Sequence, residues 1–401
     1  MAVNEIVVFI RFADEPADIY EQRGGMDYIM SMYNGETNSL EANLKEFSWG
    51  KAEAETYFWP QEADGTPICY VDEHPVSYYL NESETNPNGY TASEKYSRRS
   101  YLLYNAVNFM GGDFLEQLGI EGQPYNLVFM VPDCENWNDL LWSHKSSIVL
   151  NGKRQTYNLI TYDSKCDISK TVTHEFMHSY GYPDMYHYYN ISSSQGTPEP
   201  LSLWSIMAAT GYNTGHPTVY EKYKYGNWVD VDGFQTITKS GHYVLSPSTA
   251  EPSENTIAYK IPIQGVSDEY FMVEYRGSSN SGFDKNLRRE GLIFYRVDGS
   301  NTGNASGPPD EVFVLREDDE YVFDAYYNGT AGRTKFSEFE LYNDDTDFGI
   351  EIYNIKQENG SMSFDIKLPY ITFNVSKPSP ITIEESEDVV LYVEPYSAED
   401  G

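Results

Sequence analysis

The stretch HEFMHSYGYPD, residues 174–184, constrains the fold of this chain more than any other feature. His174 and His178 are four residues apart, so a helix through them places both imidazoles on one face, where they can hold one metal ion. Gly181 can adopt the left-handed backbone conformation that ends a helix. The pattern therefore predicts a helix that stops at this glycine and a reversal that carries Asp184 back toward the histidines.

Two nitrogen donors and one carboxylate oxygen would leave one position around the metal for water, and this distinguishes a catalytic zinc from a structural zinc closed by four protein ligands. Glu175 lies beside the first histidine, and we expect it to act as general base and then general acid. His187 is an alternative third ligand, three residues beyond Asp184. The alternatives to a catalytic metal are histidines that only pack in a helix and a purely structural zinc.

On these residues the chain resembles the metzincin zinc peptidases and, within them, the bacterial immune inhibitor A-like metallopeptidases. An aspartate followed by MY, as at Asp184, is similar to that branch, whereas most metzincins have a third histidine there. The segment SLWSIMAATG, residues 202–211, is similar to the tight turn that these peptidases have beneath the zinc, with Met207 as a packing residue. The resemblance also implies a tyrosine that supports the oxyanion, for which we assign Tyr212, with Tyr220 as the alternative.

Weaker similarities at residues 47–60, 216–228 and 269–298 extend the resemblance over most of residues 1–368. The function that it implies is a secreted, zinc-dependent endopeptidase that hydrolyses peptide bonds of extracellular proteins, with glycoproteins as a further substrate class. We expect a pH optimum at neutral or slightly alkaline values. The alternative function is surface adhesion or glycan binding on a peptidase scaffold that has lost catalysis and keeps its metal for stability.

The charge of the chain excludes several partners. The formal net charge is −35, from 27 basic and 62 acidic residues, and phosphate binding needs concentrated lysine and arginine. We therefore expect neither nucleic acid nor anionic membrane as a partner, and no apolar run is long enough for membrane insertion. Calcium is a second candidate cofactor, because acidic clusters at residues 317–319 and 343–347 offer oxygen ligands, although without the spacing of an EF-hand.

The cysteines and the first residues say little about the compartment. Cys69, Cys134 and Cys166 allow at most one internal disulfide, and we expect structural roles for all three. The first dozen residues are typical of a strand and not of a secretion signal, and this does not argue for the cytoplasm. The resemblance implies a protein that is secreted or at the cell surface, and we expect that its signal peptide has been removed.

The order of predicted elements indicates three parts. In residues 1–232 strands and helices alternate, which predicts an α+β (α/β-like), metzincin-like catalytic domain with a twisted, mostly parallel sheet and the zinc-binding helix beneath it. Residues 233–368 have short alternating strands separated by turn residues, which predicts an antiparallel, β-sandwich-like extension. Residues 369–401 are typical of the start of a further β module.

Overall fold

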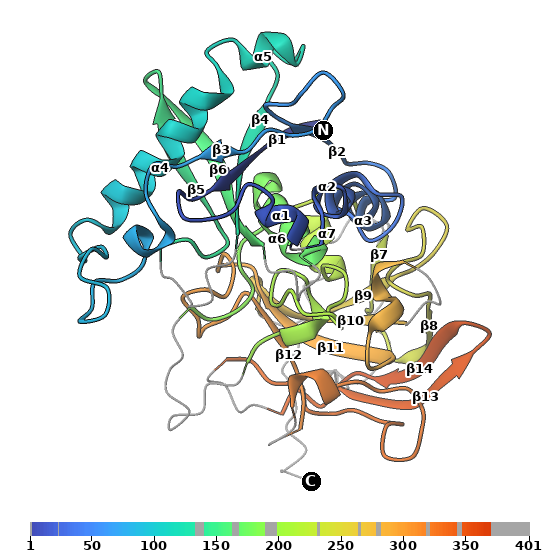
Figure 1. Cartoon of the computed structure of the whole chain (residues 1–401). Helices are drawn as coiled ribbons and strands as arrows, with labels where there is room; N and C mark the ends of the chain where they lie inside the picture. The colour runs from blue at the N-terminus through green and yellow to red at the C-terminus, as the bar shows by residue number, and fades with distance from the viewer. Residues whose placement is uncertain are drawn as a thin grey trace, which may run out of the picture.

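The computed structural model describes most of the chain: residues 2–22, 24–132, 140–162, 168–188, 199–230, 233–263, 266–277, 282–317, 321–342 and 347–369. Cys134 and Cys166 lie outside the described residues, as does nearly all of the third predicted part. Figure 1 shows two regions, an upper one of helices around a first sheet and a lower one made mainly of strands.

The first sheet has the strand order β2-β1-β4-β6-β5, and a short strand, β3, also pairs with β1. Its strands are β1 (Ala2–Arg11), β2 (Glu53–Phe58), β3 (Tyr70–Val71), β4 (Tyr125–Pro132), β5 (His144–Leu150) and β6 (Lys153–Tyr162). Every pairing is parallel except the one between β5 and β6. The sheet is therefore mostly parallel, as the alternation of strands and helices predicts.

Both faces of this sheet are covered, because successive residues of β1 belong to different cores. Val7 and Phe9 pack in the core that contains Phe176 of the histidine-bearing helix, whereas Ile6 and Val8 pack in a second core. The first face carries α1 (Ile19–Gln22), α2 (Met26–Asn34), α3 (Leu40–Ser48) and α6 (Ser169–Met177); the second carries the 3-10 helix η1 (Val76–Tyr79), α4 (Lys95–Met110) and α5 (Phe114–Gln117).

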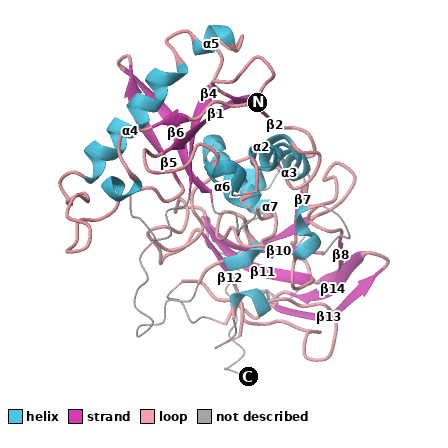
Figure 2. Ribbon diagram, viewed as in Figure 1, coloured by secondary structure: helices cyan, strands magenta, loops and turns pink. Residues whose placement is uncertain are grey.

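The lower region contains two further sheets, of strand order β12-β11-β10-β9-β7 and β13-β14-β8 (Figure 2). Their strands are β7 (Phe234–Thr236), β8 (Gly241–Leu245), β9 (Ala258–Pro262), β10 (Glu269–Arg276), β11 (Gly291–Asp298), β12 (Val312–Val314), β13 (Glu351–Glu358) and β14 (Ser361–Lys367). One core contains residues of both sheets, such as Val273 and Phe364, so the region is sandwich-like. The strands of this region pair antiparallel as expected, except that β7 and β9 pair in parallel.

The core around the histidine-bearing helix crosses the predicted boundary at residue 232. It contains Phe176 of α6 together with Met272 of β10 and Tyr295 of β11. The remaining elements are α7 (Val219–Lys224) and the 3-10 helices η2 (His178–Tyr180), η3 (Ser202–Trp204), η4 (Phe283–Asn286) and η5 (Val322–Asp324). The upper and lower regions therefore share a hydrophobic core, and the division into domains stays a prediction.

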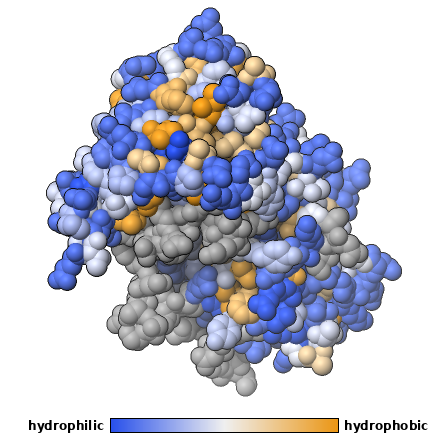
Figure 3. Space-filling view, in the orientation of Figure 1, coloured by the Kyte–Doolittle hydropathy of each residue, from blue (hydrophilic) through white to orange (hydrophobic). Residues whose placement is uncertain are grey.

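The surface agrees with the acidic composition. The face shown in Figure 3 is mostly hydrophilic, and its apolar side chains gather mainly in the upper part. In the described part of the chain, no helix combines the length and the apolar character that crossing a membrane requires.

Candidate metal centre

The predicted helix and its reversal bring three side chains together. His174 lies in α6 and His178 follows it in η2, with 4.9 Å between the ring centroids. Gly181 has φ 87° and ψ 10°, the left-handed conformation predicted for it. After this turn, Asp184 Oδ1 lies 3.1 Å from His174 Nε2 and 3.5 Å from His178 Nε2. One ligand atom from each residue lies within 4.8 Å of the other two.

Backbone carbonyls fix the orientation of both imidazoles. His174 Nδ1 lies 2.8 Å from the carbonyl oxygen of Ile206, and His178 Nδ1 lies 2.6 Å from that of Tyr182. A carbonyl oxygen can only accept a hydrogen bond, so each Nδ1 carries the proton and donates. When the rings are neutral, the lone pairs are therefore on the Nε2 atoms, which face Asp184. A hydrogen bond from the other ring nitrogen to a backbone carbonyl is typical of histidines that bind a metal.

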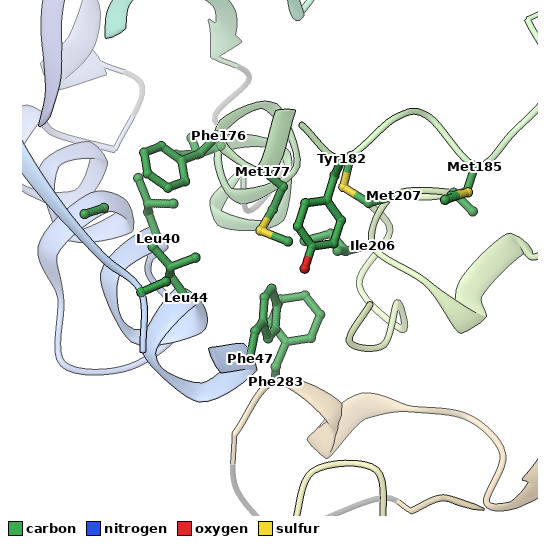
Figure 4. Packing of buried hydrophobic residues seen from close by; sticks show 14 of the residues in the cluster. Leu40, Leu44, Phe47, Phe176, Met177, Tyr182, Met185, Ile206, Met207 and Phe283 are labelled. Carbon is green, nitrogen blue, oxygen red and sulfur yellow. The ribbon is translucent and has the colours of Figure 1, made fainter. Parts of the chain in front are cut away.

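Met207 lies in the turn that supplies one of these carbonyls. Its side chain is fully buried, its N–H donates to Ser205 Oγ at 3.1 Å, and its carbonyl accepts from the N–H of Met185 at 2.8 Å. In Figure 4 the side chains of Ile206 and Met207 lie close to Met177 and Tyr182. The turn thus contacts both the histidine-bearing helix and the segment that contains Asp184.

Asp184 Oδ1 is an unusual acceptor. It is buried, and two ring nitrogens lie within 3.5 Å of it, but neither nitrogen has a proton to donate to it when both rings are neutral. A buried acceptor without a hydrogen bond costs free energy unless something else binds it. A divalent cation between the oxygen and the two nitrogens would do so. The donor set and its orientation fit zinc, which binds imidazole nitrogen and carboxylate oxygen.

Two tyrosines that the sequence motif does not single out lie beside this cluster. The Tyr188 hydroxyl donates to the second oxygen of Asp184, Oδ2. The ring of Tyr186 lies 6.5 Å from that of His174 and 5.6 Å from that of Tyr188. Their positions two and four residues after Asp184 are the only signal in the sequence, and the chain has 36 tyrosines.

The other candidates lie elsewhere. His187 Nε2 lies 2.6 Å from Asp310 Oδ1, so the structure brings Asp184, and not His187, to the two ring nitrogens. Tyr220 is buried and donates to Glu311 at 2.7 Å. Tyr212 is 70% exposed. Its backbone carbonyl accepts a hydrogen bond from Lys170 Nζ. A role of Tyr212 in supporting the oxyanion stays a prediction.

Glu175 is buried next to the cluster, and its Oε2 has no hydrogen-bond partner. Burial raises the pKa of this carboxyl, and the charge of Asp184 adds to the rise, while His174, His178 and Lys145 oppose it. Burial lowers the pKa of Lys145 to about 8, and its ammonium group donates to Ser179 at 2.8 Å. The carboxyl therefore has the raised affinity for a proton that suits a general base near neutral pH.

His174 and Asp184 form an ion pair in the metal-free protein. Burial lowers the pKa of His174, but the carboxylates of Asp184 and Glu175 outweigh burial and raise it to about 9. Burial likewise raises the pKa of Asp184, but the two imidazoles outweigh it and hold the pKa below its usual value. A cation that binds here must displace the proton of His174.

Calcium binding stays a prediction. Of the two acidic clusters, the structure describes only Glu317 in the first and Asp347 in the second. Among the described residues, one group of three or more histidine, cysteine, aspartate or glutamate side chains is placed to hold a metal ion, and it consists of His174, His178 and Asp184.

Comparisons with known proteins add little. No protein-family model matches the chain, and neither does any curated protein. Two crystal forms of wild-type OgpA from Akkermansia muciniphila are similar in structure. The first has a TM-score of 0.30 and 13% identity, over 82% of this chain and 86% of that one; the second has 0.29 and 13%, over 75% and 84%. These scores are too low to assign a function, which therefore depends on the geometry of the site.

Proposed function

We propose that this protein is a zinc-dependent endopeptidase that hydrolyses peptide bonds. One observation carries the proposal: two imidazole nitrogens with fixed tautomers converge with a buried carboxylate oxygen of Asp184, and the buried carboxyl of Glu175 lies beside them. In this proposal His174, His178 and Asp184 hold the metal, and Glu175 transfers protons.

The bound zinc would supply Lewis acidity, which polarises the peptide carbonyl and makes a water molecule more acidic. Glu175 would accept a proton from the attacking water at Oε2 and return it to the departing amine. Lys145 acts on this carboxyl through its charge and favours the ionised form that can accept a proton. The carbonyls of Ile206 and Tyr182 keep both imidazoles in one tautomer throughout.

The buried carboxyl argues against a purely structural metal. Glu175 is only 5% exposed, and its Oε2 makes no hydrogen bond. A buried polar group without a partner costs about 1–3 kcal/mol, and a structural site gains nothing from it. This cost favours a catalytic role over adhesion or glycan binding on a scaffold that has lost catalysis.

The substrates and the setting belong to the same proposal. Extracellular proteins, glycoproteins among them, are the proposed substrates, and the proposed location is outside the cell or at its surface. A net charge of −35 disfavours nucleic acid as a partner.

The proposal is tested with casein and three samples: the zinc-loaded wild type, the same protein after chelation, and Glu175→Gln. We expect one zinc ion per chain in the wild type and in the variant. We expect chelation to abolish cleavage and the variant to lose at least about 100-fold in kcat, because proton transfer by a positioned side chain contributes factors of this size.

Glu5→Gln is the matched control. Glu5 is also buried, and burial raises its pKa to about 8, so it is already mostly neutral at pH 7. Its Oε1 accepts from Asn126, a bond that glutamine keeps. This variant should cleave like the wild type. If all zinc-loaded samples were equally inactive after a blocking propeptide had been excluded, the binding function would be favoured instead.

A further inference from the structure

A loop of the lower region holds the segment that contains the third candidate ligand. This loop, residues 299–311, joins β11 to β12, and we call it the 299–311 loop. The backbone N–H of Asn304 donates to the carbonyl of Asp184 at 2.9 Å, and the N–H of Tyr188 donates to the carbonyl of Ala305 at 3.1 Å. Backbone hydrogen bonds thus join the loop to residues 184–188, although more than 100 residues separate the two segments in the chain.

The side chain of Asn304 adds a second connection. It is fully buried, and its Nδ2 donates to the carbonyl of Met185 at 3.1 Å and to that of Val312 at 2.8 Å. Its Oδ1 accepts from the N–H of Val312 at 3.2 Å. Because both amide hydrogens and the amide oxygen are used, the side chain has one orientation, and it ties Met185 to the first residue of β12.

Close packing and a side-chain pair complete the contact. Gly303 has φ +67°, and a Cβ built on it would lie 2.6 Å from Pro183 Cβ and 2.8 Å from the carbonyl oxygen of Asp184. The loop therefore passes against the backbone of Asp184 at a distance that only glycine permits. Three residues on from Asp184, His187 pairs with Asp310 of the loop at 2.6 Å.

The loop is itself anchored to the upper region through Glu311. This carboxylate is fully buried and accepts from the N–H of Gly303, from Lys224, and from the hydroxyls of Tyr220 at 2.7 Å and Tyr225 at 2.5 Å. Tyr220 and Lys224 belong to α7, and Tyr225 follows it directly. The position of the loop is therefore set by the helix that follows the methionine turn.

We propose that the 299–311 loop is a clamp that positions Asp184 for metal binding, with Asn304 as its main positioning residue. Residues 181–188 form no regular helix or strand, so contacts with the rest of the protein must fix the backbone there. Without the clamp, zinc would have to order this segment on binding, and the entropy cost would weaken the affinity. This inference rests on the proposed zinc site and extends it to a part of the chain far from the motif.

The first test measures zinc affinity of the full chain by competition with a chromogenic chelator, and thermal unfolding of the metal-free protein. We expect Asn304→Ala to bind zinc about 10–100-fold more weakly than the wild type, as is typical when a residue that holds a metal ligand in place is removed. Ile366→Ala is the control for a loss of stability. Ile366 is buried in the core of the lower region, so its truncation should lower Tm while zinc affinity stays unchanged.

The second test uses a glycine pair and does not depend on whether Asn304→Ala folds. Gly303→Ala and Gly332→Ala both place alanine at a positive φ, so both variants have the same kind of backbone strain. A Cβ at Gly332 meets nothing within 4 Å, whereas one at Gly303 meets Pro183 and Asp184. Only Gly303→Ala should weaken zinc binding, again by about 10-fold or more.

The readout is zinc binding, so the clamp and the proposed function can fail separately. A wild type that binds zinc but cleaves nothing would contradict the peptidase and leave the clamp supported if the variants bind more weakly. Equal zinc affinity of Asn304→Ala, Gly303→Ala and the wild type would overturn the clamp even in an active enzyme. A wild type that binds no zinc would overturn both.

Discussion

Zinc binding should release a proton from His174, and the affinity should therefore depend steeply on pH. In the metal-free protein the carboxylates of Asp184 and Glu175 outweigh burial and raise the pKa of His174 to about 9. The proton sits on Nε2, because Nδ1 already donates to the carbonyl of Ile206. Nε2 is the atom that must bind the metal, so the proton and zinc compete for one lone pair.

The size of the effect follows from this pKa. At pH 7 only about one molecule in 100 has a neutral His174, so the apparent zinc affinity should be about 100-fold below the value reached above pH 9. This is about 2.7 kcal/mol of binding free energy, since one pKa unit corresponds to 1.36 kcal/mol. Between pH 8 and pH 7 the affinity should fall about tenfold.

Isothermal titration calorimetry measures the number of protons directly. Zinc is titrated at pH 7.5 in buffers that differ in ionisation enthalpy, and the slope of the apparent enthalpy against that enthalpy gives the protons released. We expect about one proton from His174. The control is the same titration with Co²⁺ above pH 9, where His174 is mostly neutral: its proton should disappear from the count, and any proton that remains comes from water bound to the metal.

The result that would refute this reasoning is a zinc affinity that does not change between pH 7 and pH 8.5. Such a result would mean that His174 is neutral in the metal-free protein and that no ion pair with Asp184 precedes metal binding. A proton release that persisted unchanged above pH 9 would point to a source other than this imidazole.

Three further outcomes are expected. Tyr188→Phe removes the hydroxyl that donates to Asp184 Oδ2 and should weaken zinc binding about 10-fold. The free energy of urea unfolding of the metal-free protein should change by less than about 1.5 kcal/mol. Leu44→Ala, in the core between α3 and α6, should lower the free energy of urea unfolding by about 2–5 kcal/mol. The pKa of His174 is raised from 6.5 to about 9, so its proton stabilises the folded metal-free protein fully below pH 6.5 and is lost as the pH rises toward 9. Tm should therefore fall between pH 6.5 and about pH 9, and a constant Tm over this range would contradict the ion pair.

The helix and its reversal could be predicted because their causes are local. The spacing of His174 and His178 and the backbone freedom of Gly181 are properties of neighbouring residues, and the structure has the helix and the left-handed glycine where the sequence indicates them. The mostly parallel first sheet follows in the same way from buried apolar strands that alternate with helices.

Strand partners are less predictable than strands. β7 is a strand of only three residues, and nothing in its sequence says that it pairs in parallel with β9 while β9 and β10 pair antiparallel. The pattern reports which face of a strand is buried, and the direction of its partner depends on the path of the chain between them.

The choice between Asp184 and His187 also depends on distant residues. Both residues follow the turn closely enough to reach a metal, so sequence spacing cannot separate them. In the structure His187 pairs with Asp310, which lies 123 residues further along the chain. The competing histidine is thus occupied by the same loop whose Asn304 bonds to the backbone of Asp184.

The motif and the clamp together indicate how much of the chain the proposed catalytic unit includes. A boundary at residue 232 would keep every candidate ligand and the methionine turn, and it would lose the 299–311 loop. It would also expose Phe176 and other residues of a core that contains Met272 and Tyr295. The first part also depends on the second, because Tyr220 and Lys224 of α7 donate to the buried carboxylate of Glu311. Removing the loop would leave these two side chains without that acceptor. The candidate ligands are close together in the sequence, but the contacts that hold the Asp184 segment extend at least to Val312 of β12.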